Sequence, residues 1–151
     1  MFEGSSALAL DGKGRMTVPA RHRDIIMAQA QGRLTITLSY DGCLLMYTRP
    51  AWEKIRPTFA ALPSESADFR RMLLGNAMPC EMDGTGRVLI APELRKPLGL
   101  TLKDDGRDVM LLGVGGYFEI WEAGYLAAKQ AELKSALRPP SVLNLQLDPD
   151  V

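Results

Sequence analysis

Two short glycine-containing segments hold the residues best suited to bind a polyanion. In the first turn, residues 11–15, Asp11 and Arg15 lie four positions apart and Lys13 lies between two glycines. In the second turn, residues 83–87, Asp83 and Arg87 have the same spacing. An arginine presents a planar fork of donors, which fits a phosphate or the O6 and N7 atoms of guanine. Two compatible uses of these arginines are open: a contact to DNA, and an ion pair with the aspartate across the turn.

The two turns belong to copies of one sequence. Residues 11–23 and 83–95 align without a gap, and five of the thirteen positions are identical: the aspartate, both glycines and both arginines. Random pairing would give roughly one identity. Duplication is therefore the better explanation, and two copies make an internal pseudo-dimer rather than a solenoid, which needs three or more units.

The basic residues that follow the turns differ between the copies. Arg21 and Arg23 follow the first turn and, together with Lys13, are expected to surround it, whereas Glu93 and Arg95 occupy the equivalent positions after the second. The first copy is therefore the better candidate for a DNA surface. We expect the second copy to combine a structural role with a weaker phosphate contact. The candidate DNA-binding residues are Asp11, Lys13, Arg15, Arg21, Arg23, Asp83, Arg87 and Arg95.

The composition excludes several classes of protein. The chain has 151 residues, of which 46% are apolar, and this is enough to bury a core. Acidic and basic residues balance at 18 each, but residues 1–75 carry 10 basic and 7 acidic side chains, and residues 76–151 carry 8 and 11. A polyanion should therefore meet the first half. No apolar run reaches the roughly 18 residues of a membrane span, so we expect a cytoplasmic protein without membrane contact.

Metal and enzyme chemistry find little support. The second turn resembles the middle of a calcium-binding EF-hand loop, but with Gly86 at loop position 6, Pro92 falls where a bidentate glutamate is needed. Cys43 and Cys80 lack the spacing of a zinc site and are expected in strands as small apolar residues. His22 has no catalytic motif around it and is expected on a helix surface or at an interface. The sequence predicts no metal, no cofactor, no small-molecule substrate and no enzymatic activity.

Alternating apolar residues and turn residues predict the elements that position the two turns. A short helix should open at Pro19, and a hairpin turn is expected at Asp41 and Gly42. Ser64 or Ser66 is expected to cap a helix. Longer helices are predicted at 51–61 and 123–137. The predicted strands are 6–10, 16–18, 34–38, 43–47, a strand beginning at 80, 109–112 and 117–121.

The doubled Asp-x-x-x-Arg motif, each copy followed by an apolar and proline step and then an arginine, resembles the MraZ family of bacterial transcription regulators. These proteins are built from two AbrB-like (SpoVT-AbrB) halves. The resemblance covers residues 1–138 and departs at Ala91, where the family usually has a second proline. It divides the chain into a first repeat with linking helices (1–78), a second repeat with a closing helix (79–138) and a tail (139–151).

The resemblance implies an α+β fold in which the halves interleave into a small β-barrel of swapped-hairpin type with flanking helices. It also implies a ring-shaped homo-oligomer larger than a dimer. The turns of that ring would read short direct repeats in double-stranded DNA, upstream of a division and cell-wall gene cluster, which makes the protein nucleoid-associated. The alternative is an AbrB-like protein–protein module, such as a toxin antidote.

Overall fold

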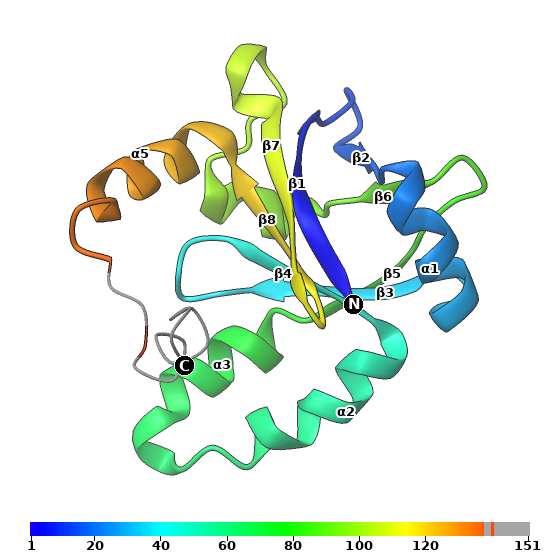
Figure 1. Cartoon of the computed structure of the whole chain (residues 1–151). Helices are drawn as coiled ribbons and strands as arrows, with labels where there is room; N and C mark the ends of the chain where they lie inside the picture. The colour runs from blue at the N-terminus through cyan, green and yellow to red at the C-terminus, as the bar shows by residue number, and fades with distance from the viewer. Residues whose placement is uncertain (138–139, 141–151) are drawn as a thin grey trace, which may run out of the picture.

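Two antiparallel sheets form the frame of the molecule (Figure 1). The computed structural model describes residues 1–137 and 140. The strands are β1 (Phe2–Ala9), β2 (Arg15–Thr17), β3 (Arg33–Leu38), β4 (Leu44–Thr48), β5 (Met78–Glu81), β6 (Arg87–Leu89), β7 (Asp108–Gly115) and β8 (Phe118–Glu122). The α-helices of this part of the chain are α1 (Ala20–Ala30), α2 (Arg49–Ala60), α3 (Ala67–Gly75), α4 (Pro92–Arg95) and α5 (Ala123–Leu133). The α+β class predicted from the sequence is confirmed.

Strand pairing joins the two copies of the repeat. The larger sheet has the order β1-β7-β8-β4-β3-β5, so the first strand of each copy pairs with a hairpin strand of the other. The two hairpins, β3–β4 and β7–β8, meet through β4 and β8. The smaller sheet is a ribbon of β2 and β6, one strand from each copy. No closed barrel is found in residues 1–137, because β1 and β5 remain at opposite edges of the larger sheet.

Successive side chains of a strand point to opposite faces of a sheet, and apolar residues pack on both faces of the larger sheet. Along β4, Leu44 and Met46 face a core shared with α1 and the β2–β6 ribbon. Leu45 and Tyr47 face a second cluster, which contains Trp52 of α2. Helices α2, α3 and α5 cover this second face, so the two turns lie on the side of the sheet away from them (Figure 1).

Several boundaries differ from the sequence-based predictions. Helix α5 ends at Leu133 rather than at residue 137, and Ser66 precedes α3 without a side-chain capping bond. Helix α1 runs to Ala30 and is longer than expected, whereas α4 has four residues, because Pro97 and a left-handed Gly99 follow it. The predicted tail lies outside the described residues, apart from residue 140.

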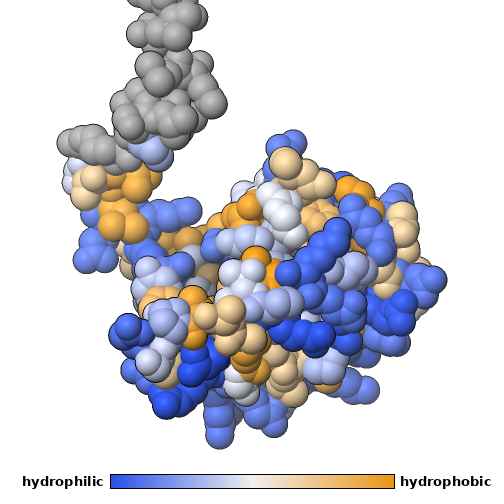
Figure 2. All heavy atoms as spheres, turned by 90° about the horizontal axis from the view of Figure 1, so that it is seen from below, coloured by the Kyte–Doolittle hydropathy of each residue, from blue (hydrophilic) through white to orange (hydrophobic). Residues whose placement is uncertain are grey.

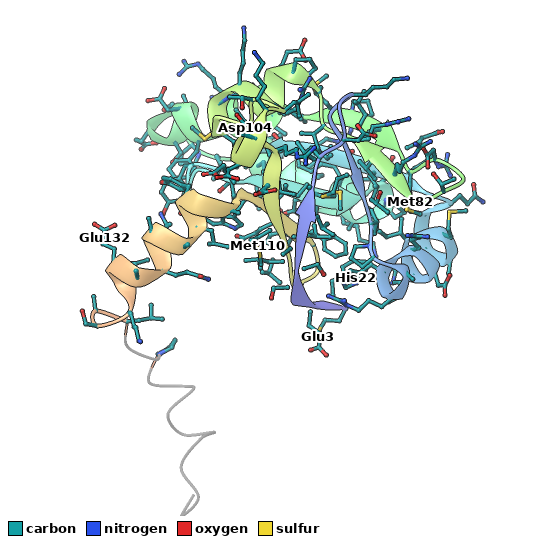
Figure 3. All side chains as sticks on the ribbon, turned by 90° about the horizontal axis from the view of Figure 1, so that it is seen from above. Glu3, His22, Met82, Asp104, Met110 and Glu132 are labelled. Atoms are coloured by element: carbon teal, nitrogen blue, oxygen red, sulfur yellow. The ribbon has the colours of Figure 1, made fainter. Side chains whose placement is uncertain are left out.

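His22 was expected on a surface or at an interface, and its predicted surface position is wrong. Its side chain extends from α1 toward the sheet and is buried against Phe2 and Phe118, with ring centroids 6.0 and 4.9 Å away (Figure 3). Burial lowers the pKa of His22, and the positive charge of Arg21 lowers it further. The second copy has Leu94 at the equivalent position, which is also buried. His22 is therefore a core residue.

Candidate nucleic-acid interface

In the first turn, the carboxylate of Asp11 holds both the backbone and the arginine. Its Oδ1 accepts bonds from the backbone amides of Lys13 and Arg15, each at 2.9 Å. Its Oδ2 accepts the Nε of Arg15 at 2.7 Å. The turn closes through a bond from the Gly14 amide to the Asp11 carbonyl. Asp11 therefore fixes the direction of the Arg15 side chain.

The second turn repeats this arrangement. Oδ1 of Asp83 accepts the amides of Thr85 and Arg87 at 3.0 and 2.9 Å, and its Oδ2 accepts Nε of Arg87 at 2.9 Å. The hydroxyl of Thr85 adds a further bond to Oδ1 at 2.9 Å. The ion pair expected across each turn is present in both copies.

The same bonds explain the acidity of the two aspartates. Hydrogen bonds to a carboxylate favour its ionised form. The bond from the Arg15 amide is the largest cause that lowers the pKa of Asp11, which falls from 3.8 to about 2. The pKa of Asp83 is also lowered, with the bond from the Arg87 amide as the largest cause. Both carboxylates are therefore charged at neutral pH.

Each arginine keeps donors available to a ligand. Among the described residues, the side chain of Arg15 bonds through Nε alone, which leaves its terminal amino groups unused. The Arg15 side chain is 28% exposed and that of Arg87 is 36% exposed, so solvent reaches both. Lys13 is exposed at the tip of the first turn, where Thr85 stands in the second. The first turn thus combines an oriented guanidinium with a second cation.

The two turns lie at opposite ends of the β2–β6 ribbon. The register pairs Arg15 with Leu89 and Arg87 with Thr17, so each arginine begins its strand opposite the end of the other strand. One ribbon therefore presents two separate turns rather than one combined patch (Figure 1).

Arg23 and Arg95 lie at the turn of the opposite copy. The guanidinium of Arg95 covers Gly14 in the first turn, and the side chain of Arg23 covers Gly86 in the second. Arg21 instead contacts β1, where its Nη2 donates to Ser6 Oγ at 2.8 Å. The sequence-based grouping of Arg21 and Arg23 around the first turn is therefore wrong.

With Arg23 and Arg95 placed at the opposite turns, the first turn is still the more basic of the two. It combines Lys13, Arg15 and Arg95, whereas the second turn combines Arg87 and Arg23 with the acidic residue Asp24 nearby. A cleft of about 400 Å³ lies beside the second turn and is bounded by Arg23, Asp24 and Met82.

Sequence reasoning missed the crossing of these arginines, although a signal for it existed. Arg23 and Arg95 match in both copies, while the residues just before them, His22 and Leu94, do not. An arginine that stays identical in both copies while the residue before it changes is a candidate for a specific contact. The contact itself depends on the pairing of β2 with β6, which the sequence does not reveal.

Other site chemistries are not evident in residues 1–137. No group of three or more metal-binding side chains occurs in this part of the chain. Burial raises the pKa of Cys43 to about 12 and that of Cys80 to about 11, so both thiols are protonated at neutral pH. No helix in the described part of the chain is long and apolar enough to span a membrane.

The comparisons with known proteins agree on one family. A family model described as "MraZ protein, putative antitoxin-like" matches residues 1–75 and again residues 72–136. A protein of Bordetella pertussis named "Transcriptional regulator MraZ" is 55% identical over 144 residues, which cover 95% of this chain and 97% of that protein. Proteins of the same name from Herminiimonas arsenicoxydans and an Acidovorax strain are 51% and 50% identical, and the alignments cover 95% and 92% of this chain and 97% and 94% of those proteins.

Proposed function

The chain belongs to the MraZ family, and we propose that it is a transcription regulator that binds specific DNA through its two Asp-x-x-x-Arg turns. The observation that carries this proposal is the carboxylate of Asp11, which bonds the backbone of the turn and Nε of Arg15 together. A guanidinium fixed in this way loses little freedom on binding, so it suits the bidentate recognition of guanine.

The two turns contribute unequally to DNA binding in this proposal. Arg15 with Lys13 makes the main base and phosphate contacts, and Arg87 makes a weaker contact because Thr85 replaces the lysine. A bidentate contact to a base discriminates by about 1–3 kcal/mol. One turn alone therefore gives modest specificity, and several turns must act together.

A ring-shaped homo-oligomer larger than a dimer would supply those several turns. Large apolar side chains remain exposed on the single chain, among them Phe69 at 44%, Leu89 at 50% and Tyr40 at 67%. The face with α2 and α3 mixes hydrophobic with hydrophilic residues (Figure 2). Linked copies bind successive short repeats with an avidity beyond that of one site. Native mass spectrometry is expected to find a closed assembly, and a monomer at micromolar concentration would contradict the ring.

The proposal also covers the promoter that the protein regulates, its location in the cell and the boundaries of its repeats. The regulated promoter is that of the protein's own division and cell-wall gene cluster, so the protein would act in the cytoplasm at the nucleoid. Residues 1–78 and 79–138 form the two AbrB-like repeats, with exchanged hairpins, and residues 139–151 form the tail. The first strand of each copy pairs with the other copy's hairpin, which supports this organisation.

A footprint on the DNA upstream of the protein's own gene tests the function. We expect protection of short direct repeats, together with tighter binding to this DNA than to a scrambled fragment of the same composition. Equal affinity for both fragments would contradict specific regulation.

The "antitoxin-like" description of the family model favours a second candidate, a module that binds a protein toxin. Absence of any footprint would favour that candidate.

A further inference from the structure

Two arginines that lie outside the turns pack against a glycine of each turn. We infer that Arg95 and Arg23 are positioning residues, each of which holds the DNA-binding turn of the opposite copy of the repeat. Each DNA-contacting unit is then a composite of both copies. The expected effect on DNA binding rests on the proposed function, whereas the positioning of the turns is a property of the folded chain alone.

At the first turn, a chain of contacts runs from Arg95 to Gly14. Nε of Arg95 donates to the carbonyl of Ile90 at 2.9 Å. The amide of Ile90 donates in turn to the carbonyl of Gly14 at 2.9 Å. The Arg95 guanidinium also covers Gly14, with Cζ and Nε 3.0 Å from where a Cβ would be. The backbone between Asp11 and Arg15 is thus supported by the second copy.

The second turn shows the same contacts with the copies exchanged. Nε of Arg23 donates to the carbonyl of Val18 at 2.7 Å, and the amide of Val18 donates to the carbonyl of Gly86 at 2.8 Å. Cδ and Cζ of Arg23 lie 2.6 and 2.8 Å from the Cβ position of Gly86. Two separate occurrences at equivalent positions make an accidental contact a poor explanation.

These contacts assign Arg95 and Arg23 a different task from that of Arg15. Their Nε groups already bond the backbone, and both side chains are half-buried against a glycine. Nε of Arg15 also forms a bond, but its partner is the Asp11 carboxylate in the same turn, whereas Arg95 and Arg23 bond backbone carbonyls and cover a glycine in the turn of the opposite copy. Because Gly14 precedes Arg15 directly, loss of Arg95 should let the backbone of the first turn move and should misdirect the Arg15 guanidinium.

Amide hydrogen exchange in the whole protein, measured by NMR, tests the positioning without DNA. In Arg95→Ala we expect the amides of Gly14 and Arg15 to exchange about tenfold faster, because local opening becomes easier, while those of Gly86 and Arg87 keep their rates. Arg23→Ala should give the reverse pattern. Equal acceleration in both turns, or acceleration in the turn of the same copy, would overturn the inference.

A double-mutant cycle on DNA affinity provides the second readout, with the DNA fragment upstream of the protein's own gene as the probe. Arg95→Ala should weaken binding about tenfold and should add little to Arg15→Ala, because both disable the first turn. Its effect should add in full to that of Arg87→Ala. Additivity with Arg15→Ala would overturn the inference.

The conservative variant Arg95→Lys separates positioning from a phosphate contact. Lysine keeps the charge but lacks the planar fork that covers Gly14 and bonds Ile90. We expect Arg95→Lys to bind as weakly as Arg95→Ala, and full binding by Arg95→Lys would contradict the inference. If Arg15→Ala leaves DNA binding unchanged, the proposed function is wrong, and the exchange pattern alone decides the role of Arg95.

Discussion

Substitution of the two glycines in the second turn should have very different effects. Gly86 has φ +84°, and a left-handed backbone costs a residue with a side chain about 1–2 kcal/mol. A Cβ there would also lie 2.6 Å from Cδ of Arg23, so this side chain must move and lose its bond to Val18, at about 0.5–1.5 kcal/mol. Gly84 lacks a positive φ, and nothing lies within 4 Å of its Cβ position. We expect Gly86→Ala to cost about 2–3 kcal/mol of unfolding free energy and Gly84→Ala about 0.5 kcal/mol at most.

Thermal unfolding followed by circular dichroism measures both variants. For a chain of this size each kcal/mol lowers the melting temperature by about 2–4 °C, so Gly86→Ala should melt about 5–10 °C below Gly84→Ala. The pair Gly14→Ala and Gly12→Ala repeats the comparison at the first turn, where Arg95 covers Gly14 and nothing lies near Gly12. Equal melting temperatures within each pair would refute the packing of these arginines on the turns.

Three further predictions concern charge. Lys13→Ala should weaken binding to every DNA sequence equally and reduce the slope of affinity against salt by about one unit, as loss of a phosphate contact does, which titrations at several salt concentrations measure. Burial lowers the pKa of His22, so the unfolded chain takes up a proton more readily and the fold loses stability as pH falls below about 6.5. His22→Leu, which copies Leu94 of the second repeat, should remove this loss, and melting curves from about pH 7.5 to 5.5 measure it. The folded-state pKa of Asp11 is about 2, so its contribution to stability is complete above about pH 4 and is lost as pH falls toward 2; Asp11→Asn should show a shallower acid transition in that range.

Much of the local structure followed from the sequence. The doubled turn, the hairpin at Asp41 and Gly42, and the ion pair between Asp11 and Arg15 all depend on residues close together in the chain, whose spacing and glycine content specify them. The fold class and the family followed from the repeat of this local pattern. Local information of this kind is readable because the bonds that close these turns join residues no more than four positions apart.

The features that the sequence did not reveal are contacts between the two copies. Arg23 was assigned to the turn that precedes it in the chain, yet the β2–β6 pairing brings it to Gly86. His22 lies between two arginines and was expected on a helix surface or at an interface, yet the pairing of β1 with β7 brings Phe2 to the core that receives its ring. The predicted closed barrel required edge pairing between β1 and β5, which does not form in the described residues.

Arg15 is proposed to read DNA in addition to forming its ion pair with Asp11. The decisive measurement is a titration of Arg15→Ala with the upstream DNA fragment and with its scrambled control, alongside a thermal melt. Arg71→Ala is the matched control, because Arg71 is also ion-paired to a nearby aspartate, Asp68, but is 74% exposed on α3. We predict that Arg15→Ala loses its preference for the upstream fragment, with affinity reduced at least about tenfold, while its melting point stays close to that of Arg71→Ala. Unchanged preference for the upstream fragment, or a collapse of the melting point, would contradict the account.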